Sequence, residues 1–352
     1  MSFGKKIDAQ MALELEEARK VEDYLKAERK KYEQLQSEPK LLILGSSDSG
    51  KSTLLKQLKI LYSNGFTSEE TKIAKQQIIN NILGICSQLL SETQPDLQNK
   101  YKPLLEYTND NDQSKEFIQD PLIDLITNLW VDPLIQNVYS GLSSKIPQTT
   151  PHFFDNLSRL VKLDSIPTNE DILLVRTVTP SISDTVFEIE NLRFHFYDVS
   201  GLKHHRKQWI SYFEDVMNIV FIVALNSYDQ MMIEDPTTNR MVDALQLYDK
   251  IVNHPLLVKP DMILFFNKKD LFEKKIVSVP VKDHFSDYDG PESSPKLAYQ
   301  FFQQKFSDLN KCKTKSVFYF LTCCTDTKFM KSIVESVISS VLKRNMQHLG
   351  MS

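Results

Sequence analysis

The chain has 352 residues, of which 41% are hydrophobic and 25% are charged, a composition typical of a globular protein with one large domain or two smaller ones. Its formal net charge of −4 argues against a general nucleic-acid-binding protein, because no excess of lysine and arginine is available to neutralise phosphates. Four cysteines in a chain of this length do not make a disulfide framework and indicate a reducing compartment. No apolar run reaches the ~18 residues of a transmembrane helix, so we predict no membrane span.

Residues 1–38 predict a long, exposed N-terminal helix. No glycine or proline occurs between Lys5 and Ser37, and glutamate, lysine, arginine, alanine and leucine dominate. Apolar residues are too sparse there to hold the helix onto a core, so a solvated charged helix and a partner-binding arm both remain open. Ser2 stands where myristoylation needs a glycine, and no cysteine precedes Cys86. We therefore expect neither N-terminal myristoylation nor palmitoylation.

The next stretch predicts a phosphate-binding loop. Residues 40–44 read as a short buried strand, and residues 53–60 carry apolar side chains at helical spacing. Between them, the pattern G-x-x-x-x-G-K-[ST] is matched by Gly45-Ser46-Ser47-Asp48-Ser49-Gly50-Lys51-Ser52. A strand, a glycine-rich loop and a helix in this order aim backbone N–H groups and a helix N-terminus at one point. Lys51 can reach the β- and γ-phosphates there and Ser52 can ligate Mg²⁺, so we predict a bound nucleotide.

Residues 63–167 differ from the rest of the chain in composition and in the pattern of their apolar residues. They are rich in polar residues and show helical patterns with few β-branched alternations. The helical patterns cover residues 71–90, 103–107, 117–130, 132–139 and 153–161. We predict an all-helical insertion domain over residues 63–167.

Strands and helices alternate after the insertion. Residues 187–189 and 192–197 predict a strand pair, residues 219–225, 262–266 and 317–321 predict further strands, and residues 328–344 predict a closing amphipathic helix. This order predicts an α/β fold in which a mostly parallel sheet has helices on both faces and binds its ligand at the carboxyl ends of the strands. Residues 39–62 and 168–352 would together form this discontinuous domain.

Polar segments follow three of the predicted strands. Asp198 comes directly after one strand, as expected for a carboxylate that holds Mg²⁺ through water. The segment 267–270 reads Asn-Lys-Lys-Asp, and a carboxylate at Asp270 would accept from the N1–H and amino groups of guanine but repel adenine. Residues 322–325 can offer a backbone N–H to the guanine carbonyl. These segments favour GTP over ATP and argue against an ATP-dependent kinase or ATPase.

Taken together, these motifs resemble those of the α subunits of heterotrimeric G proteins over essentially the whole chain. The matching segments are the phosphate loop, residues 129–136, 206–209, 213–216 and 267–273, and the Thr-Cys-x-Thr-Asp-Thr pattern at 322–327. A small Ras-like GTPase lacks both the insertion and a built-in arginine. The resemblance implies a Ras-like P-loop GTPase domain with a helical insertion. It further implies a GTP/GDP switch that transduces signals from membrane receptors to effectors.

The resemblance also implies roles for individual residues. Arg176, three residues before Thr179, falls where the family keeps an arginine finger in cis that stabilises charge on the γ-phosphoryl oxygens. Mg²⁺ would be held by Ser52 and Thr179 and, through water, by Asp198. The residues expected to bind GTP or GDP are Gly45, Asp48, Ser49, Gly50, Lys51, Ser52, Thr53, Thr149, Leu173, Leu174, Val175, Arg176, Thr177, Val178, Thr179, Asp198, Val199, Ser200, Gly201, Asn267, Lys268, Lys269, Asp270 and Cys324.

The chain departs from the family pattern at Leu202. The family reads Asp-Val-Gly-Gly-Gln where residues 198–202 read Asp-Val-Ser-Gly-Leu. The glutamine orients the attacking water, and leucine has neither donor nor acceptor for this task. We therefore hypothesise that the protein binds GTP and Mg²⁺ but hydrolyses GTP very slowly, and so dwells in the GTP state. His204 or His205 could position the water instead, or could simply be exposed helix residues.

The resemblance implies three protein partners, namely a G-protein βγ dimer, a seven-helix G-protein-coupled receptor and an unidentified effector. Without its own lipid anchor, the protein would reach a membrane only peripherally through partners such as a prenylated βγ dimer. We expect a cytoplasmic location, with the cytoplasmic face of the plasma membrane as the alternative. A second hypothesis is a GTP-bound binding module that does not cycle and is regulated by synthesis or partner exchange. Ordinary GTP turnover would exclude that hypothesis.

Overall fold

The computed structural model describes residues 38–109, 116–142, 145–177, 182–213, 216–232, 235–312 and 314–348. The predicted N-terminal helix over residues 1–38 lies outside this part of the chain except for Glu38. Two residues of the predicted nucleotide site, Val178 and Thr179, also lie outside it.

Within the described residues, a six-stranded sheet in the order β2-β3-β1-β4-β5-β6 forms the centre of the main lobe. The strands are β1 (Lys40–Gly45), β2 (Ile182–Ile189), β3 (Leu192–Val199), β4 (Asn218–Ala224), β5 (Asp261–Asn267) and β6 (Val317–Leu321). β2 pairs with β3 in antiparallel fashion, and the other neighbouring strands are parallel. The predicted α/β fold is therefore confirmed. β2 begins earlier than the sequence indicated, at Ile182 rather than near residue 187.

The strands read as continuous apolar runs because both faces of the sheet are covered. Side chains alternate between the two faces along a strand. In β1, Leu42 and Leu44 join the hydrophobic core on one face, whereas Leu41 and Ile43 join the core on the other, and all four are fully buried.

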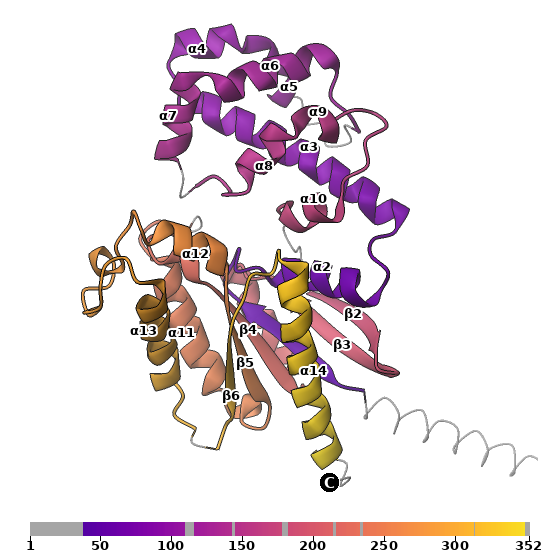
Figure 1. Cartoon of the computed structure of the whole chain (residues 1–352), viewed down its shortest axis with the longest axis vertical. Helices are drawn as coiled ribbons and strands as arrows, with labels where there is room; N and C mark the ends of the chain where they lie inside the picture. Colours follow the sequence, from indigo (N-terminus) through magenta and orange to yellow (C-terminus); the bar gives the residue numbers. More distant parts are fainter. Residues whose placement is uncertain are drawn as a thin grey trace, which may run out of the picture.

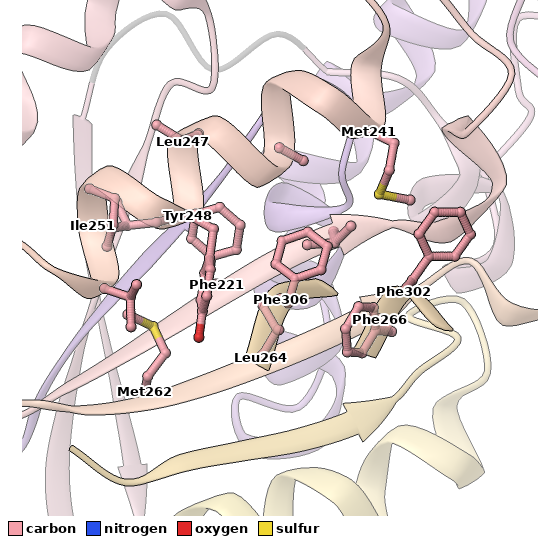
Figure 2. Close-up of a cluster of buried hydrophobic side chains, with 14 of the residues drawn as sticks. Phe221, Met241, Leu247, Tyr248, Ile251, Met262, Leu264, Phe266, Phe302 and Phe306 are labelled. Atoms are coloured by element: carbon pink, nitrogen blue, oxygen red, sulfur yellow. The ribbon is translucent and has the colours of Figure 1, made fainter. Parts of the chain in front are cut away.

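Two pairs of helices supply these two cores. One face is covered by α11 (Arg240–Val252) and α13 (Pro295–Asp308), and the other by α2 (Lys51–Tyr62) and α14 (Thr327–His348). Figure 2 shows the first face, where Phe306 of α13 lies among side chains of α11 and the strands. The Phe306 ring centroid is 5.2 Å from that of Tyr248 and 5.5 Å from that of Phe266.

Short helical segments connect these elements on the sheet lobe. They are η1 (Lys203–Tyr212), η2 (Leu225–Ser227), α12 (Lys269–Lys275), η3 (Pro255–Leu257) and η4 (Val281–Asp283). η1, η2 and α12 follow the ends of β3, β4 and β5, so they frame the edge of the sheet at which the strands terminate.

The insertion forms a second lobe of helices beyond the ends of the strands (Figure 1). α10 (Asn169–Leu174) comes directly after the predicted insertion. The described helices of the insertion itself are α3 (Ser68–Ser91), α4 (Pro95–Lys100), α5 (Lys102–Asn109), α6 (Asp120–Val131), α7 (Pro133–Gly141), α8 (Thr150–Asp155) and α9 (Leu157–Leu160). These helices share a hydrophobic core that is separate from the two cores of the sheet. The prediction that the inserted residues are helical is confirmed.

The first helix of the insertion, α3, begins with a capping box. Thr67 caps α3, because its hydroxyl accepts from the Glu70 N–H at 3.2 Å while the Glu70 carboxylate accepts from the Thr67 N–H at 3.0 Å. At the other end, Leu174 and Val175 still pack against the insertion core. The bounds of 63 and 167 for this domain stay a prediction.

Replacing Phe306 by alanine should lower the free energy of unfolding of the sheet lobe by about 3–5 kcal/mol, because the cavity left between α13, α11 and β5 cannot be filled. Phe318 is 40% exposed on the edge strand β6, and Phe318→Ala should cost less than about 1 kcal/mol. Urea unfolding followed by circular dichroism measures both changes. Equal losses for the two variants would contradict the assigned core.

Candidate functional site

A cavity of about 380 Å³ opens at the carboxyl ends of the parallel strands, between the sheet lobe and the insertion. Its wall combines the loop after β1, residues 173–177, residues 200–202, the segments after β5 and β6, and residues 145–149 of the insertion. Loops that are distant in sequence meet here because parallel strands end at the same edge of the sheet.

The loop between β1 and α2 wraps around the ammonium group of Lys51. Lys51 Nζ donates to the carbonyl oxygens of Gly45 at 3.1 Å and Ser46 at 2.9 Å. Gly50 has a φ of 109°, and a Cβ there would collide with the Asn267 amide, so the loop requires glycine at this position. Burial lowers the pKa of Lys51 to about 8. A buried cation beside the first N–H groups of α2 suits a bound polyphosphate.

Two oxygen-bearing side chains meet at the start of α2. Ser52 Oγ donates to Asp198 Oδ2 at 3.3 Å, and Asp198 is buried at the end of β3. Hydroxyl and carboxylate oxygens are ligands that Mg²⁺ prefers, so the pair fits the predicted metal site. Within the described residues, no group of three or more His, Cys, Asp and Glu side chains is arranged to hold a metal ion. The third predicted ligand, Thr179, lies outside the described residues.

Residues 200–209 lie against the phosphate loop and are tied to α11. A Cβ on Gly201 would overlap the backbone of the phosphate loop, so this approach requires glycine. The Gly201 carbonyl accepts from the Arg206 guanidinium at 3.3 Å, and the same group binds both Asp243 oxygens at 2.9 and 2.7 Å. Trp209 is buried and donates its Nε1–H to the Ser200 carbonyl at 3.2 Å. These contacts couple the cavity-facing residues 200 and 201 to the sheet lobe.

Leu202 follows Gly201 directly and lies in the cavity wall. His204 and His205 lie on η1, where their rings pack edge to face with centroids 4.1 Å apart. Neither histidine contributes to the described wall of the cavity.

A cluster of positive charges surrounds Asp48 of the phosphate loop. Asp48 Oδ2 accepts from Lys268 at 3.2 Å and from Arg240 at 3.3 Å. The Asp48 side chain is 40% exposed, and its partial desolvation favours the neutral carboxyl. The charges of Lys268, Arg240 and Arg176 outweigh this effect and hold the pKa of Asp48 well below its usual range. Arg240 also donates to the Ser47 carbonyl at 2.8 Å, so α11 supports the loop directly.

The side chain of Asn267 connects three loops at the other end of the cavity. Its Nδ2 donates to the Ser49 carbonyl at 2.9 Å, and its Oδ1 accepts from the Cys324 N–H at 3.0 Å. Asp270 lies in the cavity wall, and the Cys323 thiol donates to its Oδ1 at 3.2 Å. A carboxylate in this position can accept hydrogen bonds from a purine edge.

The insertion reaches the cavity through residues 145–149 and His152. Asn226 of η2 donates its Nδ2–H to Gln148 Oε1 at 2.8 Å, which joins the two lobes across the cavity. Thr149, the predicted contact from the insertion, lies in the wall next to this bond.

Most residues of the predicted site meet in this one cavity. Those in its wall are Asp48, Ser49, Gly50, Lys51, Ser52, Thr53, Thr149, Leu173, Leu174, Val175, Arg176, Thr177, Ser200, Gly201, Leu202, Asn267, Lys268, Asp270 and Cys324. Gly45 and Asp198 lie behind the wall, in contact with Lys51 and Ser52. Val199 instead lies fully buried in the sheet core, and Lys269 pairs with Glu273 along α12.

Sequence reasoning missed several residues of the wall, among them Lys56, Gln148, Asn226, Gln230 and Arg240. Lys56 lies one helical turn after the phosphate loop, and its position on α2 was the one available signal. The others lie on elements that no motif marks, and only the packing of the chain brings them to the cavity.

Comparison with known proteins agrees with this geometry. The family model described as "G-protein alpha subunit" matches residues 15–341. The guanine nucleotide-binding protein alpha-3 subunit of Caenorhabditis elegans is 37% identical over 321 residues, which cover 89% of this chain and 90% of that protein. The alpha-17 subunit of the same organism is 35% identical with the same coverage. The G(o) subunit alpha of Planorbella trivolvis is 33% identical over 99% of this chain and all of that protein.

Replacing Asn267 by alanine should weaken GDP binding by about ten- to one-hundred-fold, or about 1.4–2.8 kcal/mol in total, because the Ser49 carbonyl and the Cys324 N–H lose the partner that holds their loops in place. Asn253 is a matched control, since its amide also bonds to backbone but lies away from the cavity. Titration with a fluorescent GDP analogue measures the affinity of both variants. An Asn267→Ala protein that binds as tightly as Asn253→Ala would show that Asn267 does not organise the cavity.

Proposed function

Because this chain belongs to the G-protein α-subunit family, whose members are GTPases that switch between GTP and GDP in signalling, we propose that it binds GTP with Mg²⁺ in the cavity and hydrolyses GTP very slowly. The proposal of slow hydrolysis rests on the position of Leu202 in the cavity wall, directly after Gly201. The proposal of GTP binding is supported by the phosphate loop, Asp270 and Cys324, which all line the same cavity.

We assign the phosphates of the nucleotide to the loop after β1. The buried Lys51 ammonium and the first N–H groups of α2 would contact the β- and γ-phosphates. The guanine base would lie between Lys268 and the segment after β6, with Asp270 accepting from the N1–H and amino groups and the Cys324 N–H near the carbonyl. Thr149 would approach the nucleotide from the insertion.

Ser52 and Asp198 fit a Mg²⁺ site, with Ser52 as a direct ligand and Asp198 acting through water, and Thr179 as the further ligand that the family resemblance implies. When bound, Mg²⁺ would neutralise charge on the phosphate oxygens. The 3.3 Å bond between Ser52 Oγ and Asp198 Oδ2 keeps the two side chains oriented toward each other.

Arg176 would stabilise the charge that develops on the γ-phosphoryl oxygens during hydrolysis. It lies in the cavity wall and its charge acts on Asp48 of the phosphate loop, which supports this assignment. Charge stabilisation alone leaves the attacking water unoriented, and orientation accounts for a large part of the catalysis of phosphoryl transfer.

Leu202 would not orient the attacking water in line with the γ-phosphate, as hydrolysis requires. Its side chain has no hydrogen-bond donor or acceptor, and it occupies the place where the family keeps glutamine. His204 and His205 do not reach the described cavity wall, so we favour a site in which no side chain replaces the glutamine. The protein would then remain in its GTP-bound form for long periods.

We further propose that the partners are a G-protein βγ dimer, a membrane receptor of the seven-helix type and an effector, with no nucleic acid among them. None of the helices in the described residues is suited to span a bilayer. We also propose that membrane contact is peripheral and is made through these partners, at the cytoplasmic face of the plasma membrane. A GTP-bound binding module that does not cycle remains a second candidate, favoured by the same Leu202.

Replacing Leu202 by glutamine should raise the rate of GTP hydrolysis by orders of magnitude, because the amide can orient the attacking water. Single-turnover hydrolysis of preloaded GTP with Mg²⁺ compares the native chain, Leu202→Gln and the control Leu202→Ala, which adds no polar group. A native rate equal to that of Leu202→Gln would refute the proposed role of Leu202, and a native rate that is also fast would exclude the non-cycling module.

Replacing Ser52 by alanine should remove most of the effect of Mg²⁺ on GTP affinity, while affinity measured in EDTA changes little. The reason is that the hydroxyl is proposed to ligate the metal and not the phosphates. Ser63→Ala removes an exposed hydroxyl at the far end of α2 and serves as the control. Fluorescent GTP-analogue titrations with and without Mg²⁺ make the comparison, and an unchanged Mg²⁺ effect in Ser52→Ala would contradict the assignment.

A further inference from the structure

Side chains from two different lobes hold residues 175–177, the short segment that carries Arg176. From the sheet lobe, Lys56 of α2 donates its Nζ–H groups to the Val175 carbonyl at 2.9 Å and to Thr177 Oγ1 at 3.1 Å. Burial lowers the pKa of Lys56 to about 8, so its ammonium group depends on these two acceptors.

The insertion holds the same short segment from the opposite side. Asn81 of α3 donates its Nδ2–H to the Arg176 carbonyl at 3.1 Å. Thr177 Oγ1 in turn donates to Gln77 Oε1, also on α3, at 3.2 Å. The Thr177 hydroxyl therefore accepts from one lobe and donates to the other, in a continuous chain of hydrogen bonds from α2 to α3.

Residues 175–177 have no regular secondary structure of their own that could fix their course. They follow the last residue of α10 and belong to neither a helix nor a strand. The Val175 N–H bonds to the Asp171 carbonyl at the end of α10, but the carbonyls of Val175 and Arg176 are bound by side chains.

Asn81 and Gln77 are not needed to place α3 itself. The helix is anchored by apolar residues such as Ile78, Ile79 and Ile82, which are fully buried in the insertion core. The side chains of Asn81 and Gln77 are only partly buried and reach out of this core toward the cavity-lining segment.

We propose that Lys56, Gln77 and Asn81 are positioning residues for Arg176, and that the arginine is correctly placed only while the two lobes are closed on each other. This inference rests on the proposed role of Arg176 at the γ-phosphate. A displacement of about 1 Å in a group that contacts the transition state can cost about 10²-fold in rate. Val175 packs against the insertion core, whereas Lys56 binds its carbonyl from the sheet lobe. Separation of the lobes therefore breaks the bonds on one side of this segment, and Arg176 is no longer held from both lobes.

The test uses the full chain carrying Leu202→Gln, because hydrolysis must be fast enough for a decrease in its rate to be measured. In this background, Asn81→Ala should lower the single-turnover rate of GTP hydrolysis by about 10- to 100-fold, and Gln77→Leu should lower it in the same direction. Arg176→Ala should lower the rate by about 10³-fold or more. Gln88→Ala, a partly buried change near the other end of α3, should leave the rate unchanged.

A double-mutant cycle separates positioning from general damage to the fold. If Asn81 acts through Arg176, then Asn81→Ala should have no further effect once Arg176 is alanine. A merely structural role would lower the rate by the same factor in both backgrounds, and that result would overturn the inference. An unchanged rate in Asn81→Ala and Gln77→Leu would overturn it as well.

A second readout requires no hydrolysis and uses the native Leu202 chain. Asn81→Ala and Arg176→Ala should each speed the release of GTPγS several-fold more than the release of GDP, because Arg176 is proposed to contact the γ-phosphate. If Arg176→Ala has no effect in either assay, the proposed function of Arg176 fails. If Arg176→Ala acts but Asn81→Ala does not, only the positioning inference fails.

Discussion

The side-chain amide of Asn267 sets the spacing between the two ends of the cavity. It binds the Ser49 carbonyl in the loop after β1 and the Cys324 N–H in the loop after β6. β4 lies between β1 and β5 in the sheet, so no backbone ladder connects the phosphate loop to the end of β5 directly. The Asn267 amide, which has a donor and an acceptor on one planar group, therefore provides the direct link that the sheet does not. The parallel register makes this possible by bringing the three strand ends to the same edge.

The two lobes meet through polar contacts rather than through a shared core. The insertion core is separate from the two cores on the faces of the sheet. The bonds from Asn226 to Gln148 and from Asn81 to the Arg176 carbonyl join the lobes around the cavity. Such bonds exchange with water at a small net free energy, whereas exposing a core is costly. We infer that the lobes can separate to admit or release a nucleotide while each keeps its own core.

Under the proposed function, residues 200–202 would separate GTP binding from GTP turnover. Gly201 and Arg206 remain tied to Asp243 of α11, so the segment that faces the phosphates keeps a defined course. Leu202, the next residue, brings an apolar side chain to the cavity where a water would have to be oriented. Such a protein would retain the geometry that binds GTP but would lack the glutamine that orients water for GTP hydrolysis. In signalling terms, its lifetime in the GTP state would be set by nucleotide exchange or by partners.

The sequence by itself determined the α/β fold, the helical insertion, the family and the phosphate loop. Each of these depends on patterns that are local, such as the apolar run of β1 and the glycines of the loop. Motif membership alone does not tell which of the predicted residues face the cavity. Val199 turns into the core because side chains alternate along β3, and Lys269 pairs along its own helix with Glu273.

Only the tertiary structure decided which distant side chains complete the cavity. Arg240 reaches Ser47 across 193 positions of sequence, Lys56 reaches Thr177 across 121, and Asn81 reaches Arg176 across 95. Lysine, arginine and asparagine in a helix carry no local signal of such contacts, since these residue types usually face solvent. Their partners are backbone carbonyls and a hydroxyl in loops, whose places follow from how the sheet, its helices and the insertion pack together. The physical reason is that hydrogen-bond partners of this kind are set by proximity in space, which the chain acquires only when it folds.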